Sequence, residues 1–316
     1  MAVGGYGNGF QYFICKETIL ESENLSNVNH LQMKRSVYMS IAKDILKNIH
    51  YNFWKLHSNF LKKNSKLRNL HQGETCLILG NGGSLRYLDF SKLKGIPTIG
   101  CTYSLLDRRA MQLDLKYMVF TDPYELMPVR YNRLTKTFQT KFYAPLFKSQ
   151  IKEYRHITFF SSLTNVYAHF FRPGNLFYFN YRPKKSMDHD ISGDFSYTDN
   201  ALHIMIGVAK YLGFKKVILL GCDYLGEPKL EGHFYAYRKP AVGETDLPFC
   251  EKAKKITEGL DVIFVSLKGI QSPVFESAPF SEYFGGQENY LENTDIVDEK
   301  YLRLLRRGAD KKQVYL

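Results

Sequence analysis

Short apolar runs alternate with helix-like stretches through the middle of this chain of 316 residues, and each run ends in a small or polar residue. The strongest run, Lys216 to Leu220, leads directly to Asp223. The stretch before it, Ala201 to Leu212, places its apolar residues on one helical face, and Gly213 is placed to cap it. Alternation of this kind predicts an open, mostly parallel sheet with helices on both faces.

Other segments fit the same pattern. A second helix is expected at Phe249 to Gly259. Further strands are expected at Glu74 to Gly80, Pro97 to Thr102, Leu115 to Thr121, Leu176 to Asn180 and Asp261 to Ser266. We therefore predict an α/β, Rossmann-like fold.

The positive charge of the chain is concentrated near its two ends. The 43 Lys and Arg against 31 Asp and Glu give a net charge of +12. Residues 33–72 hold nine basic residues and one acid, and residues 300–316 hold six and one. The interval 73–299 holds 27 basic and 26 acidic residues, so the body is nearly neutral. RNA binding, which a basic and aromatic-rich chain suggests, fits poorly with such a body, and no nucleic-acid partner is expected.

These charges suggest four parts: an extension over 1–32, a basic amphipathic helix over 33–72, the α/β domain over 73–285, and a basic C-terminal tail over 286–316. Two interpretations of the basic helix stay open. Its apolar stripe could dock on the body or on a second copy of the chain, forming a homo-oligomer. It could instead lie on an anionic membrane surface, with Tyr301 to Arg307 as a second basic, apolar element.

Cysteine usage and hydropathy indicate a cytoplasmic protein. The five cysteines are scattered and form no C-x-x-C pair, so neither a disulfide framework nor a structural zinc site is expected. No apolar stretch approaches the roughly 18 residues of a membrane span. The first ten residues lack the charged and apolar regions of a signal peptide. The basic segments allow a peripheral position at the inner membrane.

Polar residues follow four of the expected strands, and ligands of open α/β sheets bind beyond the carboxyl ends of the strands. The candidate site therefore consists of Asn81 to Ser84, Cys101 to Tyr103, Thr121 with Asp122, and Asp223 with Tyr224. Asp223 closes the strongest strand. It is expected either to bind a ligand or to cap the following turn.

The loop Gly80-Asn81-Gly82-Gly83-Ser84 could present backbone N–H groups to a phosphate or ribose. Leu85 stands where a dinucleotide fingerprint has its third glycine, and no Walker lysine follows, so NAD and P-loop sites are weakly supported. A tight turn with Ser84 as the helix N-cap is an equal alternative.

Two further clusters carry chemistry. Asp188-His189-Asp190 has the Asp-x-Asp spacing that can hold a divalent cation, but the lysines and acids around it favour a solvated loop, and no metal site is assigned. Ten residues after Asp223, a loop combines His233, Tyr235, Tyr237 and Arg238. These side chains could supply a general base and donors for a phosphate.

Two segments together resemble a known group of transferases. Residues Leu77 to Leu85 resemble the Gly-Asn-Gly-Pro-Ser-Leu opening of bacterial lipooligosaccharide sialyltransferases. Residues Thr198 to Asp223 are similar to their Thr-Ser-Gly helix and following strand. This segment looks even more like the related group of motility accessory factor flagellin glycosyltransferases and hydroxymethylpterin pyrophosphokinase. A His-Phe loop of that group is matched by His233 and Phe234. The resemblance covers roughly Gly73 to Pro279.

The resemblance implies a metal-independent, inverting glycosyltransferase that moves a sialic-acid-like sugar from a CMP-activated donor to a surface glycan or glycolipid. It needs no cofactor besides this donor substrate. By position, Asn81, Gly82 and Ser84 would line the nucleotide site. Thr198 matches the first residue of the Thr-Ser-Gly motif, with Asp199 next to it, and Thr102 replaces an Asn of the family.

The segment Tyr235 to Tyr237 resembles a Tyr-Ala-Phe segment of the family, whose Tyr helps the phosphate leave. His233 is our candidate base and Arg238 a further donor, because of their chemistry. The alternative function is a magnesium-dependent pyrophosphokinase of the pterin type. Its ligands would come from Asp122, Asp188, Asp190 or Asp223.

Overall fold

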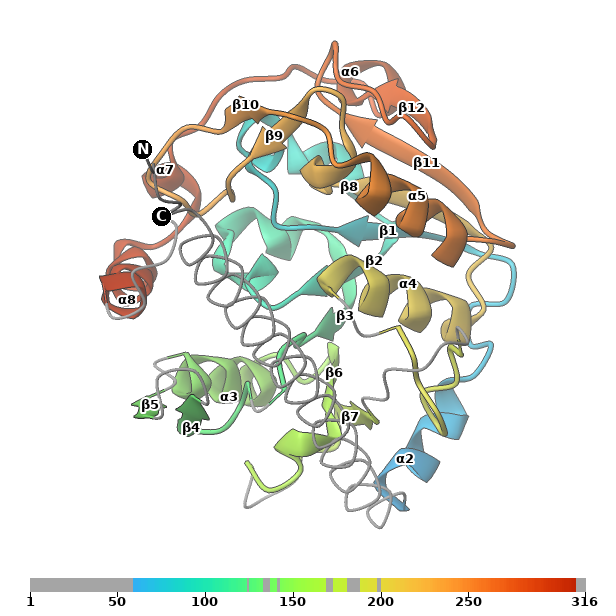
Figure 1. Cartoon of the computed structure of the whole chain (residues 1–316), viewed down its shortest axis with the longest axis vertical. Helices are drawn as coiled ribbons and strands as arrows, with labels where there is room; N and C mark the ends of the chain where they lie inside the picture. The colour runs from blue at the N-terminus through green and yellow to red at the C-terminus, as the bar shows by residue number, and fades with distance from the viewer. Residues whose placement is uncertain are drawn as a thin grey trace, which may run out of the picture. The chain divides into compact units, whose positions relative to one another are not determined.

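The computed structural model (Figure 1) describes residues 59–123, 125–132, 137–140, 143–168, 173–180, 188–197 and 200–310. These residues belong to one unit of the chain, Trp54–Leu316. The extension 1–32 and all but the end of the predicted basic helix lie outside the described residues, as do Thr198 and Asp199.

The main element is an eight-stranded sheet in which every pair of neighbouring strands is parallel. Its order is β12-β11-β8-β1-β2-β3-β6-β7. The strands are β1 Thr75–Leu79, β2 Pro97–Cys101, β3 Asp114–Val119, β6 Thr158–Ser162, β7 Leu176–Phe179, β8 Lys216–Leu220, β11 Asp261–Ser266 and β12 Glu276–Pro279. The predicted α/β, Rossmann-like class is confirmed.

Helices and two hairpins connect these strands. The α-helices are α2 Asn59–Lys62, α3 Ala144–Glu153, α4 Ala201–Leu212, α5 Leu247–Ile256, α6 Phe280–Tyr283, α7 Asn293–Ile296 and α8 Glu299–Asp310. The short 3-10 helices are η1 Lys63–Leu67, η2 Gly83–Tyr87, η3 Phe90–Leu93, η4 Ser104–Leu106, η5 Arg108–Gln112, η6 Leu163–Asn165 and η7 Asp223–Leu225. The hairpins are β4 Val129–Asn132 with β5 Thr137–Thr140, and β9 Lys229–Glu231 with β10 Ala241–Gly243.

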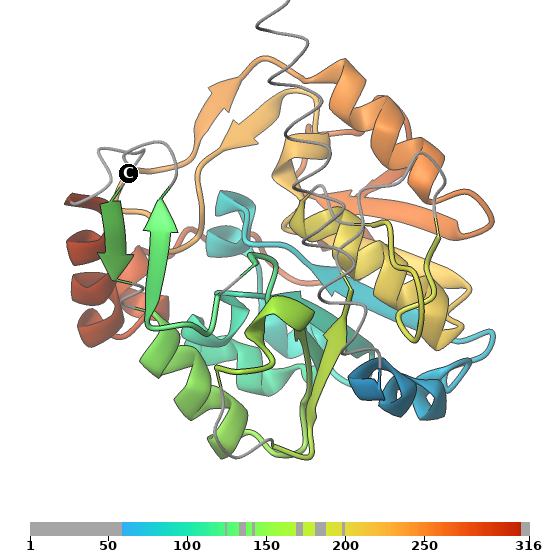
Figure 2. The same ribbon diagram turned by 60° about the horizontal axis from the view of Figure 1, so that its bottom comes forward.

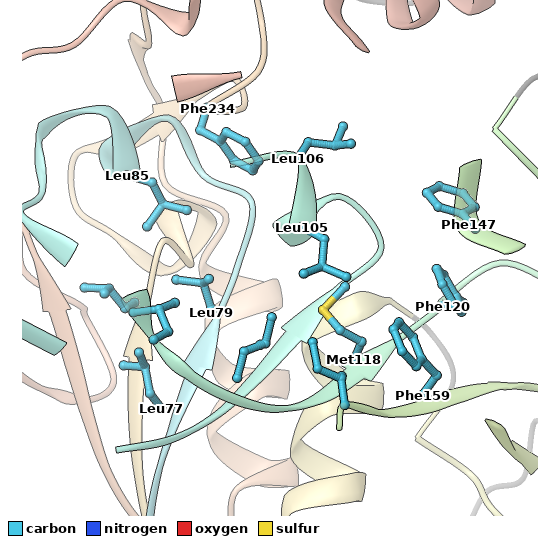
Figure 3. Packing of buried hydrophobic residues seen from close by; sticks show 14 of the residues in the cluster. Leu77, Leu79, Leu85, Leu105, Leu106, Met118, Phe120, Phe147, Phe159 and Phe234 are labelled. Carbon is cyan, nitrogen blue, oxygen red and sulfur yellow. The ribbon is translucent and has the colours of Figure 1, made fainter. Parts of the chain in front are cut away.

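Successive residues of the central strands enter two different hydrophobic clusters, one on each face of the sheet. Leu77 and Leu79 join the cluster shown in Figure 3, whereas Cys76 and Ile78 join the other. The first cluster includes Phe147 of α3 (Figure 3), and the second includes the buried hydrophobic residues of α4 and α5. Figure 2 shows these helices from a second side. Strands buried on both faces explain why β1 and β8 are continuous apolar runs.

Helix α4 has the predicted bounds, and both of its ends are capped locally. The Asn200 side chain accepts a hydrogen bond from the N–H of His203 at 2.9 Å. Gly213 adopts φ +90°, a left-handed conformation that favours glycine, and its N–H donates to Ala209 and Lys210. These caps place the start of β8 directly after the helix.

The described part of the C-terminal segment packs into the body. Ile296, Val297, Leu302 and Leu305 are buried in the same cluster as Leu77. The carbonyl of Leu305 in α8 also accepts a hydrogen bond from the Tyr143 hydroxyl at 3.3 Å. Within the described ranges, no helix has the length and apolar character needed to cross a membrane.

Candidate active site

The polar residues after β1 and β8 lie where the chain changes direction across the sheet. From β1 the chain continues to β2 on one side, whereas β8 pairs with the other side of β1 and is followed in the sheet by β11. In open parallel sheets such a point leaves a crevice beyond the carboxyl ends of the two central strands, where ligands bind. The structure therefore brings together the predicted site residues Gly80 to Ser84 and Asp223.

Two glycines let these segments touch backbone to backbone. A Cβ atom on Gly80 would lie 2.2 Å from the carbonyl oxygen of Gly221, and one on Gly82 would lie 2.4 Å from Cγ of Asp223. The N–H of Gly80 donates to the Leu220 carbonyl, and the N–H of Gly82 to that of Gly221, each at 2.8 Å. Any side chain at these positions would separate the two loops.

The N–H groups of this loop are engaged within the protein. Besides Gly82, Gly83 donates to the Gly232 carbonyl at 3.2 Å, and the N–H of Ser84 donates to Oδ2 of Asp223 at 2.8 Å. The expectation that these N–H groups are offered to a phosphate is therefore wrong for these three residues in this structure. Ser84 is also not the N-cap, because η2 is preceded by Gly82 and has no side-chain cap.

Ser84 and Asp223 form a buried pair. The Ser84 hydroxyl donates to Oδ1 of Asp223 at 2.5 Å, so both carboxyl oxygens accept from this one residue. Complete burial raises the pKa of Asp223 to about 6, although the hydrogen bonds from Ser84 act in the opposite direction. The pair joins the loop after β1 to the end of β8.

Asn81 is the residue of this loop with an available polar group. It is half-buried, and its Oδ1 lies 3.4 Å from the Ser104 hydroxyl, whose single proton is shared with the Cys101 carbonyl at 2.9 Å. Its Nδ2 has no partner among the described residues, so this amide can donate to a ligand. The contact with Ser104 also links the loop after β1 to the loop after β2.

Thr102 and Thr121 extend the site along the ends of β2 and β3. Their hydroxyl oxygens lie 3.3 Å apart. Thr102 has φ +23°, which is unusual for a β-branched residue, and its N–H donates to the Val119 carbonyl at 2.9 Å. Such conformations cluster at functional sites. The neighbouring Asp122 is exposed.

His233 lies directly against the loop after β1. It forms an antiparallel bridge with Gly82, and its Nδ1 lies 3.3 Å from the carbonyl oxygen of Asn81. A proton on Nδ1 makes this contact a hydrogen bond and leaves the lone pair on Nε2, which has no partner within the described part of the chain. Burial lowers the pKa of His233 below its usual 6.5, although the bond to Asn81 opposes this. A neutral imidazole with a free Nε2 can act as a general base near pH 7.

The Tyr235 ring stacks on His233, with ring centroids 5.0 Å apart, and it also contacts Tyr103 at 5.0 Å in a tilted arrangement. Burial raises its pKa, so the hydroxyl stays protonated. That hydroxyl forms no hydrogen bond with a described residue. The Tyr235 hydroxyl can therefore donate a hydrogen bond to a ligand, next to the imidazole that can accept a proton.

Tyr237 and Arg238 lie at the exposed end of the same loop. The Tyr237 hydroxyl accepts a hydrogen bond from Nε of Arg306 at 2.6 Å, and the Arg306 guanidinium lies 4.2 Å from the Tyr237 ring centroid. Because the hydroxyl oxygen accepts from Arg306, its own proton remains available to a ligand. Arg306 belongs to α8, so the C-terminal helix contributes to this side of the site.

The Asp188-His189-Asp190 motif is not part of this cluster. Oδ1 of Asp190 accepts from the Ser192 hydroxyl and pairs with Arg68 at 2.9 Å. Arg68 also covers the ring of Tyr211, near the end of α4. Among the described residues, no three His, Cys, Asp or Glu side chains are grouped so that they could hold a metal ion.

Three residues that contact the candidate site were not predicted from the sequence. They are Ser104 beside Asn81, Tyr143 beside Tyr103 and Arg306 beside Tyr237. Tyr143 precedes α3, a helix that was not predicted, and its ring lies 5.8 Å from that of Tyr103. Arg306 was assigned to a basic tail. A polar residue three positions after the end of a strand could have pointed to Ser104. No local pattern connects Tyr143 or Arg306 to the site.

Two pockets lie away from the predicted site residues. One, of about 630 Å³, is lined by residues that include Lys66, Arg155 and Phe177. Its lining includes Thr158, the first residue of β6, so it opens at the amino edge of the sheet. The other, of about 490 Å³, includes Tyr87 in its lining. Neither pocket is lined by a predicted site residue, so the candidate active site rests on the hydrogen bonds and ring contacts described above.

No protein-family model matches this chain, and no curated protein matches it. Among solved structures, the chain is similar to the sialyltransferase CstII from Campylobacter jejuni in complex with cytidine-5'-monophosphate. The identity is 15% and the TM-score 0.40, and the match covers 74% of this chain and 98% of that one. CstII in complex with the substrate analogue CMP-3FNeuAc gives 14% identity and a TM-score of 0.39, covering 70% and 90%.

A third structure, CST-II with a trisaccharide acceptor and CMP, gives 15% identity and a TM-score of 0.39, covering 69% of this chain and 93% of that one. At these values the likeness is one of fold alone. All three structures are of sialyltransferases.

Proposed function

We propose that this chain is a glycosyltransferase that moves a sialic-acid-like sugar from a CMP-activated donor to a hydroxyl group of a glycan. The observation that carries the proposal is the stacked pair His233 and Tyr235 beside the loops after β1 and β8: the Nε2 of the imidazole and the hydroxyl of the phenol have no partner among the described residues. The sequence resemblance over Leu77 to Leu85 and Thr198 to Asp223 supplies the donor class.

In this reaction the acceptor oxygen attacks the anomeric carbon while the bond from that carbon to the CMP phosphate breaks. Nε2 of His233 takes the proton from the acceptor hydroxyl, which is a poor nucleophile until the proton leaves. The bonding electrons leave with the phosphate oxygen, and the hydroxyls of Tyr235 and Tyr237 and the Arg238 guanidinium stabilise that charge. Attack opposite the leaving group inverts the anomeric centre.

The donor nucleotide would lie against Asn81, Thr102 and Thr121 at the ends of β1, β2 and β3. Asn81 offers its Nδ2 group, and the two threonines offer hydroxyls to the ribose or the base. Asp223 and Ser84 would act by holding the loop, because their polar atoms bind each other. We further propose that no divalent metal is required, and that the basic terminal segments hold the enzyme at an anionic membrane surface.

To test the reaction, the purified chain is incubated with CMP-sialic acid and a panel of oligosaccharides, in the presence and absence of EDTA. We expect CMP release that needs an acceptor and persists in EDTA. Strictly magnesium-dependent AMP formation from ATP and a hydroxymethylpterin would instead identify the pyrophosphokinase.

His233→Ala tests the base. We expect kcat to fall by roughly 10²- to 10⁴-fold, because acceptor deprotonation is lost, while CMP affinity measured by calorimetry stays near that of the unmodified chain. Because the pKa of His233 is lowered from 6.5, kcat/KM should decline with acid only below that pH, and this limb should disappear in the variant. His156→Ala, a change at an exposed histidine, is the matched control. Retained turnover in His233→Ala would refute the assigned role.

A further inference from the structure

Arg86 is a fully buried arginine two residues after Ser84, and its side chain has 0% exposure. A buried guanidinium is stable only when its N–H groups find partners. Nη1 donates to the carbonyl oxygens of Ala236 at 3.3 Å and Arg238 at 3.1 Å. Nε donates to the Leu291 carbonyl at 3.0 Å, and Nη2 pairs with Glu292 at 2.9 Å. One side of this fork therefore binds the backbone of the loop that carries Tyr235 and Tyr237.

Asn293 binds the same loop from the C-terminal segment. It is 4% exposed, and its Nδ2 donates to the carbonyl oxygens of Tyr235 at 3.3 Å and Ala236 at 3.0 Å. The carbonyls of Tyr235, Ala236 and Arg238 accept from no other described residue. Two buried side chains therefore hold a stretch of backbone that has no sheet ladder of its own.

The two segments that carry these side chains are joined to each other by backbone hydrogen bonds. The N–H of Leu291 donates to the Arg86 carbonyl at 2.7 Å, and the N–H of Asn289 donates to the Tyr87 carbonyl at 2.9 Å. The segment 289–293 thus lies beside η2, and this places the Asn293 side chain against the backbone of the loop 233–238. Among the described residues, the other backbone bonds of the loop 233–238 are those of the bridge between His233 and Gly82, which include the bond from Phe234 to Asn81, and the turn in which Ala236 donates to His233.

We propose that Arg86 and Asn293 are positioning residues for transfer: they fix the backbone of residues 235–238 so that the Tyr235 and Tyr237 hydroxyls meet the departing phosphate. This inference rests on the proposed function. Displacement of such groups by about 1 Å can cost on the order of 10²-fold in rate, because the reacting geometry is lost while binding contacts persist. The C-terminal segment is thereby part of the active site without touching the substrate.

Arg109 provides a matched control. It is also largely buried, and it donates to the carbonyls of Leu85 and Leu88 and to Asp107 at 2.7–3.0 Å, but it forms no hydrogen bond with the loop 233–238. Arg86→Lys and Arg109→Lys each replace a planar guanidinium, which has five N–H donors, by a compact ammonium group of the same charge. Both should lower the melting temperature, and only the first should affect the loop.

The experiment compares Arg86→Lys, Asn293→Ala and Arg109→Lys in steady-state transfer from CMP-sialic acid, in CMP affinity by calorimetry, and in melting temperature. We expect kcat to fall about 10²-fold for the first two, with CMP affinity changed less than about threefold. The double variant should fall little further than either single one, because both residues secure one loop. Asn293→Ala tests the inference even where Arg86→Lys fails to fold.

Hydrogen exchange provides a readout that does not depend on the activity. Each variant is measured the same number of degrees below its own melting temperature. Amides within residues 233–238 should then exchange faster in Arg86→Lys and Asn293→Ala than in Arg109→Lys. If the unmodified chain shows no transfer while this exchange difference is present, the proposed function fails and the positioning of the loop stands. Equal exchange in all three variants, or equal kcat losses at matched melting temperature, would overturn the inference.

Discussion

Asp223 accepts hydrogen bonds on both carboxyl oxygens from the backbone and side chain of Ser84. A carboxyl at the end of the strongest strand was predicted from the sequence either to bind ligand or to cap a turn. The structure shows a third arrangement, in which Asp223 holds the loop after β1 through Ser84. Complete burial makes this an unfavourable place for a negative charge, which is why its pKa is raised.

This raised pKa predicts a pH-dependent stability. The folded-state pKa of Asp223, about 6, lies above its ordinary value of 3.8, so the folded chain binds a proton more tightly than the unfolded chain does. The carboxyl therefore destabilises the fold at neutral pH, and this cost is relieved as the pH falls through 6. Between pH 7.5 and 5 we expect the unmodified chain to gain about 1.5 kcal/mol relative to Asp223→Asn.

Urea denaturation of both chains at the two pH values measures this difference. Other titrating groups are shared by the two chains and cancel in the comparison. A difference that does not change with pH would mean that Asp223 is ionised in the folded protein with an ordinary pKa.

At the scale of elements, the loops after β1 and β8 depend on the missing side chain of Gly82. A Cβ atom there would lie 2.4 Å from the Asp223 carboxyl and 2.6 Å from the Gly221 carbonyl oxygen. In Gly82→Ala the loops must move apart, which we expect to cost about 1–3 kcal/mol of unfolding free energy and to weaken CMP binding. Thermal denaturation and calorimetry measure the two effects.

Gly174→Ala is the matched control, because a Cβ atom at this exposed glycine meets nothing within 4 Å. We expect it to change the unfolding free energy by no more than about 0.5 kcal/mol. Equal behaviour of the two variants would show that the loop after β1 can open without cost, contrary to the contacts described above.

Most elements of the sheet could be predicted because their signal is local. The apolar runs of β8 and β11, and the caps of α4, give the observed bounds from sequence alone. The elements β12, β6 and α3 were not predicted. Strand β12 is a short edge strand, Glu-Ser-Ala-Pro, whose few apolar residues and terminal Pro279 resemble a turn. Helix α3 begins with a proline in its first turn and is only partly apolar.

At the scale of the whole described body, the C-terminal segment returns to the beginning of the sheet. Arg86 contacts Leu291 and Glu292 across more than 200 residues of sequence, and Arg306 contacts Tyr237. From charge alone, the part 286–316 was assigned as a separate tail. Its described residues instead bury Leu302 and Leu305 and supply Asn293 and Arg306 to the candidate site.

The basic segment before the body supports a prediction about membranes. Replacing Lys34, Lys43 and Lys47 by Gln should weaken binding to phosphatidylglycerol vesicles by about 10²-fold, since each lysine near an anionic surface contributes about 1 kcal/mol. Vesicle sedimentation measures this, with phosphatidylcholine vesicles as the neutral surface. The matched control neutralises three exposed lysines of the body: Lys94, Lys255 and Lys268.

Equal losses in the two triple variants would show that the effect is one of net charge rather than of this segment. Loss of a dimer in size-exclusion chromatography, with vesicle binding unchanged, would instead support docking of the segment on a second copy of the chain.

The sequence by itself determined the α/β class, the position of α4 and the strands around it, and the edge of the sheet at which polar residues gather. These follow from apolar periodicity and end caps, which act over a few residues. The tertiary structure decided which polar atoms remain available there. Asp223 binds Ser84 across 139 residues, and the N–H groups of Gly82 to Ser84 are used within the fold. Arg86 and Asn293 hold the loop of His233 and Tyr235. Such hydrogen bonds join residues far apart in sequence, so no local pattern records them.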